Sequence, residues 1–401
     1  MKKWWFCILC IILDVFLCSC EVNVPQKSQE QGRNEAKITL KPTEIPEETE
    51  VPEQTEEPFE VVEKRNIKIK GRRYKYAAYV KTVSGKISLL SLKTEEDILY
   101  IPSDIEGNPV VLVGWPKEEG YQWSDQIETN KLGWNLGKKK RLLKRVIFEE
   151  GIERLDDFGG VVADEIIIPK SMREIEDSSF YEAKIKKVLV RSNQVNLGAN
   201  AFQKSTLEQI YFPDDFSGEI GNDCFNDSNL KEFRWPSYGK QKVEDMGASV
   251  FEGCKKLKKI TFPENQERII IPKHSFFWCK KLTKLEFPAS TKKVVYAATH
   301  YADNYKYGVS TLIFKGKNTK LKGGDIRDVN LLTEVPDGLS LITVKKIIAP
   351  KDSKAIEFAK KAVKIADMNE WKPEDATCEN GLDHPAVLQE DLVPVEYEIR
   401  G

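Results

Sequence analysis

The segment Leu207-Glu208-Gln209-Ile210-Tyr211-Phe212-Pro213 contains the pattern on which much of the chain is built. An aliphatic residue is followed by apolar residues three and five positions later, and then by proline. Apolar residues two positions apart lie on one face of a strand. The proline that follows cannot donate a hydrogen bond to a neighbouring strand. The segment therefore predicts a short strand that turns Ile210 and Phe212 inward and ends at Pro213.

The same pattern recurs along the chain at intervals of 20 to 35 residues. Its nine copies begin at Leu143, Ala163, Ile185, Leu207, Leu230, Leu257, Leu282, Val309 and Val344. One copy alone cannot bury its apolar residues, whereas stacked copies bury them against each other. We therefore predict an α/β repeat protein, a solenoid of about nine to ten coils with short parallel strands.

A second apolar position lies between successive strands and is always phenylalanine. Its copies are Phe180, Phe202, Phe225, Phe251 and Phe276, and a small residue follows each of them three positions later, namely Ala183, Ser205, Ser228, Cys254 and Cys279. Because this position accepts Ala, Ser or Cys, small size is what it requires, and the two cysteines are predicted to be core thiols. Their expected Cα separation of about 5 Å leaves a disulfide open. A metal site that adds His274 is the other alternative.

These motifs resemble a known family. The pattern Leu-x-x-Ile-x-Phe-Pro, together with Gly247-x-x-x-Phe251-x-x-Cys254, is similar to the BspA-like bacterial surface leucine-rich repeat. The segment 101–111 is similar to the first repeat of that family, and 348–353 is similar to the approach to its closing helix. The resemblance covers residues 98–366. It implies a leucine-rich-repeat solenoid and a binding or adhesion role at the cell surface.

The N-terminus resembles an export signal. Two lysines precede an apolar run of 14 residues, Trp4 to Leu17, which is shorter than the roughly 20 residues that span a bilayer. Leu17-Cys18-Ser19-Cys20 resembles a bacterial lipobox, and this resemblance implies that Cys20 is lipidated. We therefore expect a signal peptide at 1–19 and a protein anchored to the outer face of the bacterial cell membrane. The alternative is an ordinary cleaved signal that happens to contain cysteines.

The remaining segments have distinct expected roles. Residues 20–60 are rich in proline and glutamate and predict a disordered tether. Residues 61–97 alternate polar and apolar side chains, which predicts an N-terminal β-hairpin cap. Within the repeats at 98–366 we expect an insertion at 115–141 and a helical cap at 353–364, with Ser353 as its N-cap. Residues 367–401 form a C-terminal tail.

A candidate partner-binding surface follows from the strand pattern. The residue between the two inward residues of each strand points outward. In four successive copies this residue is apolar: Ile147, Ile167, Leu189 and Tyr211. A contiguous apolar patch on a strand face usually has something that covers it. Either the insertion, which contains Trp115, Trp123 and Trp134, folds over it, or an extracellular protein binds there with Tyr211, Trp123 and Trp134 as anchors.

A basic column runs beside these residues. It contains Lys144, Arg145, Lys186, Lys187, Lys258 and Lys259. Acidic residues such as Asp164 and Glu165 interrupt it, which favours a solvated polar face. The alternative is a site for an anionic glycan or wall polymer. A third possibility is a structural spacer that binds nothing.

The sequence favours a binding protein over an enzyme. It contains no recognised motif for a metal site, a phosphate-binding loop or a catalytic nucleophile, so we expect neither a cofactor nor a catalytic residue. With 62 Lys+Arg against 63 Asp+Glu, the formal net charge is −1. This balance argues against nucleic acid as a partner.

Overall fold

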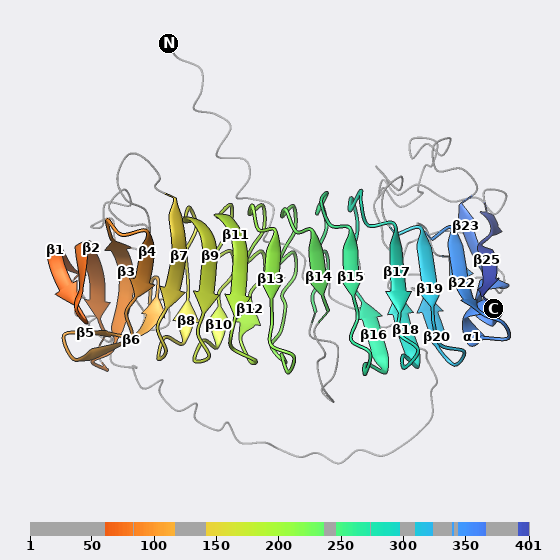
Figure 1. The fold of residues 1–401 in the computed structure, drawn as a ribbon, viewed down its shortest axis with the longest axis horizontal. Helices are drawn as coiled ribbons and strands as arrows, with labels where there is room; N and C mark the ends of the chain where they lie inside the picture. The colour runs from red at the N-terminus through yellow and green to blue at the C-terminus, as the bar shows by residue number, and fades with distance from the viewer. Residues whose placement is uncertain are drawn as a thin grey trace, which may run out of the picture. The chain divides into compact units, whose positions relative to one another are not determined.

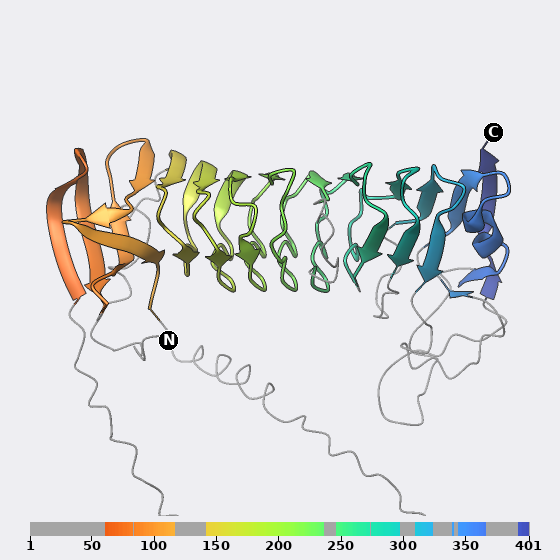
Figure 2. The ribbon, with the colours of Figure 1, turned by 90° about the horizontal axis from the view of Figure 1, so that it is seen from below.

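The computed structural model describes residues 61–82, 84–116, 142–235, 246–272, 274–296, 309–323, 339–340, 344–365 and 392–400. All of them belong to one structural unit, residues 56–401. Within it the chain passes repeatedly between two layers of strands, and each passage adds one coil beside the previous one (Figure 1, Figure 2). The predicted signal peptide at 1–19 and the tether at 20–60 lie outside the described residues.

The first layer begins with a five-stranded parallel sheet, which we call the strand face. Its strands, in order, are β4 (Ile98–Ile101), β7 (Leu143–Phe148), β9 (Val162–Ile168), β11 (Lys184–Val190) and β13 (Gln209–Tyr211). Neighbours pair in parallel, as stacked coils require. Farther along the chain, this layer contains two more sheets, β14 (Glu232–Arg234) with β15 (Lys259–Thr261), and β17 (Lys284–Phe287), β19 (Thr311–Phe314), β22 (Lys346–Pro350) and β25 (Glu396–Arg400).

The second layer contains short strands that close the opposite side of each coil. They are β6 (Asn108–Val113), β8 (Arg154–Leu155), β10 (Glu174–Ile175) and β12 (Asn196–Leu197), with β5 (Asp104–Ile105) paired to β6. A later sheet follows in this layer, β16 (Arg268–Ile271) with β18 (Lys293–Tyr296) and β20 (Lys320–Gly323). A separate small sheet near the C-terminal end contains β21 (Leu339–Ser340), β23 (Ala362–Ile365) and β24 (Leu392–Pro394).

The core between the layers contains a phenylalanine ladder, in which each ring packs on the ring of the next coil. Its members are Phe158, Phe180, Phe202, Phe225, Phe251 and Phe276, with successive ring centroids 4.8 to 5.8 Å apart. From Phe180 onward these are the phenylalanines that the repeat pattern places inside. The small residues that follow them are also buried, as the pattern predicts.

Three antiparallel strands precede the repeats, where the sequence predicted a hairpin. They are β1 (Val61–Ile69), β2 (Arg72–Lys81) and β3 (Ile87–Lys93), and β3 then pairs in parallel with β6. Trp115, which the sequence assigned to the insertion, is 4% exposed and packs with Ala78, Val80 and Leu90. It is therefore a core residue of these first strands. The rest of the insertion, 117–141, lies outside the described residues.

The C-terminal helix is shorter than predicted. Helix α1 spans Lys354–Ala359 instead of 353–364, and the Oγ of Ser353 accepts a hydrogen bond from the N–H of Ile356 at 3.3 Å, as expected for an N-cap. Residues 362–365 form β23 instead, which pairs with β24. The segment expected to be a tail returns to the repeats, since 392–400 forms β24 and β25.

Candidate functional site

The predicted outward residues form a continuous apolar column across the strand face. Tyr100 is in register with Ile147, which is in register with Ile167. Ile167 is in register with Leu189, and Leu189 with Tyr211. The column therefore crosses all five strands and has a tyrosine at each end. Tyr100 is an addition to the four residues that the sequence indicated.

Exposure differs along the apolar column. Tyr211 is 45% exposed, whereas Ile147 and Leu189 are half-buried. Ile167 is only 8% exposed. It lies on the middle strand of the sheet, in register between Ile147 and Leu189. Ile167 is therefore part of the packed surface, and the accessible contact area lies around Tyr211.

Each terminal tyrosine carries a cation over its ring. The guanidinium carbon of Arg72 lies 3.8 Å from the ring centroid of Tyr100. The ammonium nitrogen of Lys187 lies 5.4 Å from the ring centroid of Tyr211. A cation within about 6 Å of an aromatic face is attracted by the ring quadrupole. These contacts favour a defined orientation of both rings.

The basic column is an ion-paired surface. The carboxylate of Glu165 lies 2.8 Å from Arg145 and 2.9 Å from Lys187, on the two flanking strands. The hydrogen bond from Lys187, helped by Arg145, holds the pKa of the Glu165 carboxyl below its ordinary value. Other predicted cations also pair, Lys144 with Asp97 at 2.9 Å, Lys186 with Asp164 at 2.6 Å and Lys258 with Glu232 at 3.5 Å, while Lys259 is exposed at the start of β15. The positive charge of this column is therefore largely compensated in place.

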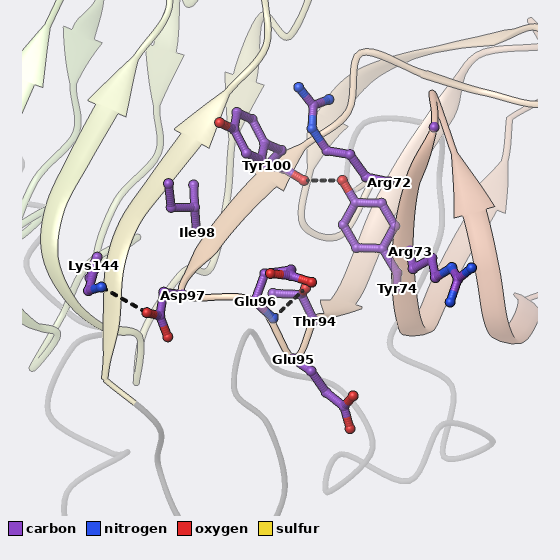
Figure 3. A pocket seen from close by; sticks show the side chains of 11 residues that line it. Arg72, Arg73, Tyr74, Thr94, Glu95, Glu96, Asp97, Ile98, Tyr100 and Lys144 are labelled. Carbon is purple, nitrogen blue, oxygen red and sulfur yellow. Dashed lines mark hydrogen bonds and ion pairs between the residues drawn. The ribbon is translucent and has the colours of Figure 1, made fainter.

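A cavity of about 700 Å³ lies at the β4 end of the apolar column. Its walls come from β2 and β4 and from the acidic turn before β4, and they include Arg72, Tyr74, Asp97, Ile98 and Tyr100 (Figure 3). Among the described strands, β4 pairs only with β7. On its other edge, the hydroxyl of Tyr74 donates to the carbonyl oxygen of Tyr100 at 2.9 Å. The cavity thus lies along the open edge of the strand face.

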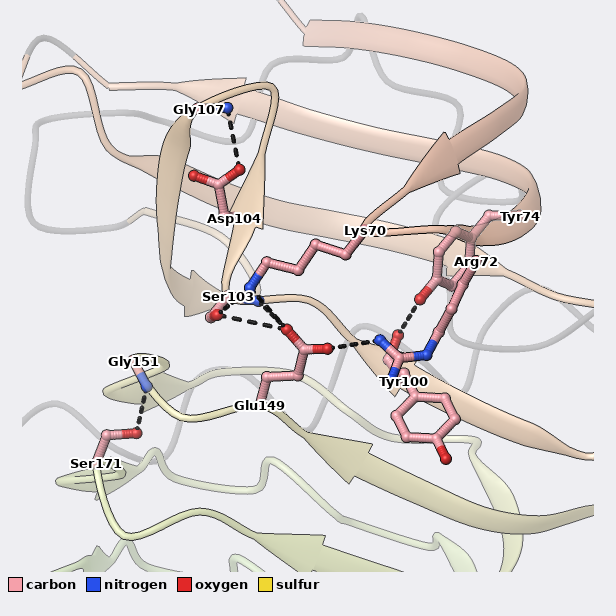
Figure 4. A network of polar contacts seen from close by, with 10 residues as sticks. All are labelled: Lys70, Arg72, Tyr74, Tyr100, Ser103, Asp104, Gly107, Glu149, Gly151 and Ser171. Carbon is pink, nitrogen blue, oxygen red and sulfur yellow. Dashed lines mark hydrogen bonds and ion pairs between the residues drawn. The ribbon is translucent and has the colours of Figure 1, made fainter.

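A carboxylate network lies beside this cavity and shares Arg72 with it. Glu149, which follows β7, accepts hydrogen bonds from the side chains of Lys70 at 3.0 Å and Arg72 at 2.7 Å. It also accepts one from the backbone N–H of Ser103 at 3.2 Å (Figure 4). Lys70 and Arg72 belong to the turn and strand of the first hairpin. Glu149 therefore links this hairpin to the first coils.

Replacing Glu149 by Gln should loosen the first hairpin at neutral pH. Burial alone would raise the pKa of the Glu149 carboxyl. The hydrogen bonds that it accepts and the charges of Lys70 and Arg72 outweigh this effect, so the pKa lies below its ordinary value of 4.5. A lowered pKa stabilises the fold above the pKa of the unfolded chain, and this contribution is lost as the pH falls through the folded pKa. We expect a loss of about 1–2 kcal/mol at pH 7, seen as faster amide hydrogen exchange in β1 and β2.

The neighbouring Glu150 provides a matched control for this prediction. Its carboxylate accepts hydrogen bonds from the N–H groups of Lys170 and Ser171, which belong to the next coil and not to the hairpin. Glu150→Gln should therefore leave the exchange of β1 and β2 unchanged. Below the pKa of Glu149 in the folded protein, the Glu149→Gln variant and the wild type should show the same hydrogen exchange in β1 and β2. Equal exchange of the hairpin in both variants at pH 7 would contradict the role of Glu149.

The described cysteines are structural thiols. Cys224, Cys254 and Cys279 are free and buried, so the disulfide left open by the sequence is not formed. The thiols of Cys254 and Cys279 donate to the carbonyl oxygens of Phe225 and Phe251, each at 3.0 Å. Burial raises the pKa of Cys254 to about 12, which leaves it protonated at neutral pH. No cluster of His, Cys, Asp and Glu suited to a metal ion occurs in the part of the chain that the structure describes.

Three predicted site residues lie outside the described residues: Cys20, Trp123 and Trp134. The sequence interpretation missed Tyr100, Arg72 and Ile98, which join the strand face to the cavity. The signal for Tyr100 was present, because Leu99-Tyr100-Ile101-Pro102 repeats the inward-outward-inward-proline pattern of the later strands. In the described part of the chain, no helix has the length and apolar character needed to cross a membrane.

Comparison with known proteins places the repeats in a family. No curated protein matches the chain. Similar solved structures include the pneumococcal vaccine antigen PcpA (16% identity, 74% of this chain and 77% of that chain, TM-score 0.38) and a leucine-rich cell surface protein from Faecalibacterium prausnitzii A2-165 (11% identity, 69% and 88%, TM-score 0.28). A leucine-rich-repeat protein from Bacteroides ovatus ATCC 8483 is a third (14% identity, 70% and 95%, TM-score 0.21). Residues 139–243 and 218–307 match the family described as BspA type leucine rich repeat region, in six copies. Residues 139–307 of this chain are therefore similar to the repeats of the BspA type leucine-rich-repeat family.

Proposed function

We propose that this chain is a cell-surface protein that binds a protein partner non-covalently on its strand face. The observation that carries this proposal is the apolar column, which crosses five hydrogen-bonded strands in register and ends at Tyr211, 45% exposed. Large aromatic side chains with apolar neighbours are typical anchors of protein interfaces. The similarity of residues 139–307 to BspA type repeats supports a binding or adhesion role in general.

The cavity beside β4 is the second part of the proposed site. It combines an aromatic and aliphatic wall, Tyr100 and Ile98, with charges of both signs from Arg72 and Asp97. Its volume of about 700 Å³ lies within the usual range for ligand pockets. An extended segment of a partner could add along the open edge of β4 by backbone hydrogen bonds, with one side chain in the cavity.

The proposed attachment to the cell follows from the N-terminal sequence. A lipid on Cys20 would hold the protein at the outer face of the bacterial membrane, and residues 20–60 would act as the tether. We further propose that β1–β3 cover one end of a solenoid of about nine to ten coils and that α1 covers core residues near the other, because terminal repeats must shield an exposed core.

Two rival functions have less support. The basic column was the candidate site for an anionic glycan or wall polymer, but carboxylates lie 2.6 to 3.5 Å from five of its cations, Lys144, Arg145, Lys186, Lys187 and Lys258. A polyanion would have to displace these internal partners. A non-binding spacer would give no reason for an exposed Tyr211 at the end of an apolar column.

Selection from a random peptide library displayed on phage tests the proposal. Peptides that bind the immobilised full chain should lose at least tenfold in affinity when Tyr211 is replaced by Ala, because an exposed aromatic anchor contributes more than about 1.4 kcal/mol. Tyr181→Ala is the matched control. Tyr181 also carries a lysine over its ring, Lys204 at 5.2 Å, but it lies outside the strand face.

The outcomes separate the three functions. Equal affinity in the Tyr211→Ala and Tyr181→Ala variants would exclude the strand face as the site. Failure to select any peptide would favour the spacer. Dextran sulfate serves as the polyanion probe, and binding that weakens with salt and with loss of Lys186 and Lys187 would favour the anionic-ligand function.

A further inference from the structure

The last described strand of the first layer leaves core positions open. In β25, Tyr397 is in register with Ile347 and Ile399 with Ala349 on β22. Ile347 and Ala349 are fully buried, as are the residues at these positions in the preceding strands. Tyr397 and Ile399, however, are 46% and 50% exposed. Two large apolar side chains thus occupy the inward register, and among the described strands none pairs with β25 beyond them.

Within the described residues, the backbone of β25 is paired with a strand on one side only. The N–H of Glu396 donates to the carbonyl oxygen of Lys345 at 3.1 Å, so Glu396 directs its backbone groups toward the β22 side. Because successive residues of a strand alternate in direction, Tyr397 and Ile399 direct their N–H and C=O groups to the other edge. Among the described strands, β25 pairs only with β22. In both ribbon views β25 lies at the end of the row of strands (Figure 1, Figure 2).

The sequence of β25 is complementary to itself in the antiparallel direction. It reads Glu396-Tyr397-Glu398-Ile399-Arg400. When two copies are paired about Glu398, each Glu396 lies opposite an Arg400, and each Tyr397 lies opposite an Ile399. The Tyr–Ile pairs would be the hydrogen-bonded ones, because their backbone groups face the open edge. The central Glu398 is already paired with Lys346 at 2.5 Å, which offsets the like charges at the two-fold axis.

We propose that the chain forms a two-fold symmetric dimer by antiparallel pairing of β25 with β25 of a second copy. Such a contact is isologous and closes after two subunits, so it does not lead to fibres. It joins the two four-stranded sheets into one and covers Tyr397 and Ile399 with the same residues of the partner. Opposite charges at Glu396 and Arg400 specify the register. The dimer would display two strand faces on one particle.

Charge reversal provides the test, with sedimentation velocity of the full chain over a dilution series as the readout. Glu396→Arg places two arginines opposite each other at both ends of the strand pair, and Arg400→Glu places two glutamates there. Each variant alone should raise the dimer dissociation constant at least tenfold. An equimolar mixture of the two variants should form a heterodimer, because every opposed pair is then Arg with Glu. The double variant should regain the wild-type dimer.

The controls keep this test independent of the binding function. Lys320→Glu changes the charge by the same amount as Arg400→Glu, but on an exposed residue of the second layer, and should leave the dimer unchanged. Tyr211→Ala should also leave it unchanged. A wild-type chain that stays monomeric at all concentrations would overturn the proposal. So would single variants that dimerise as the wild type does, or a mixture that forms no heterodimer.

Discussion

Replacement of Phe202 by Ala is expected to lower the free energy of unfolding by about 3–5 kcal/mol. Phe202 is fully buried in the phenylalanine ladder. Its ring lies 4.8 Å from that of Phe180 and 5.6 Å from that of Phe225, and both pairs are stacked. Truncation removes both ring contacts and leaves a cavity that the hydrogen-bonded coils on either side cannot close. Urea denaturation followed by circular dichroism measures the loss.

The part of the chain that loses stability in the Phe202→Ala variant distinguishes a stacked repeat from an ordinary core. Each coil contacts mainly its neighbours, so a cavity at one ring uncouples the coils on its two sides. Hydrogen exchange should increase most in the coils of Phe180 and Phe225. Phe212→Ala is the matched control, because Phe212 is only partly buried at the edge of the core. It should cost about 1–2 kcal/mol. Equal losses in the two variants would contradict the importance of the ladder.

The coil interior could be predicted because its determinants lie within one coil and repeat in the next. Spacing alone placed Ile210, Phe202 and Ser205 inside, and all three are buried. The outward register of Ile147, Ile167, Leu189 and Tyr211 followed from the same alternation. The exposure of these residues did not follow. Ile167, on the middle strand of the sheet, is buried, whereas Tyr211, on its last strand, is exposed.

The ion pairs could not be predicted from the pattern because they join different strands. Glu165 was noted only as an interruption of the basic column, whereas it lies between Arg145 and Lys187 in the folded chain. The ends of the repeats were also hard to predict. Val363 lies in a run that also suits a helix, and its strand is selected by pairing with β24, about 30 residues away in the sequence.

Replacement of Gly198 by Ala is expected to destabilise the protein by about 3 kcal/mol or more, with no change in polarity. A Cβ atom at Gly198 would lie 2.5 Å from the backbone nitrogen of Asp177 and 2.7 Å from the carbonyl carbon of Glu176. Neither can move away easily, because the Asp177 side chain accepts a hydrogen bond from the N–H of Ala199 at 2.7 Å. Gly221 and Gly247 have the same close contact with the preceding coil.

Gly159→Ala separates this steric effect from the general effect of replacing glycine. At Gly159 the nearest atoms to a new Cβ would be 3.5 Å away, an ordinary contact. Alanine lowers the conformational entropy of the unfolded chain, so this control should be neutral or stabilising by about 0.4–1 kcal/mol. The same substitution is thus expected to change stability in opposite directions at Gly198 and Gly159 in one urea series. Equal effects at both sites would mean that neighbouring coils can separate to admit a methyl group, and glycine would then not be required where successive coils approach most closely.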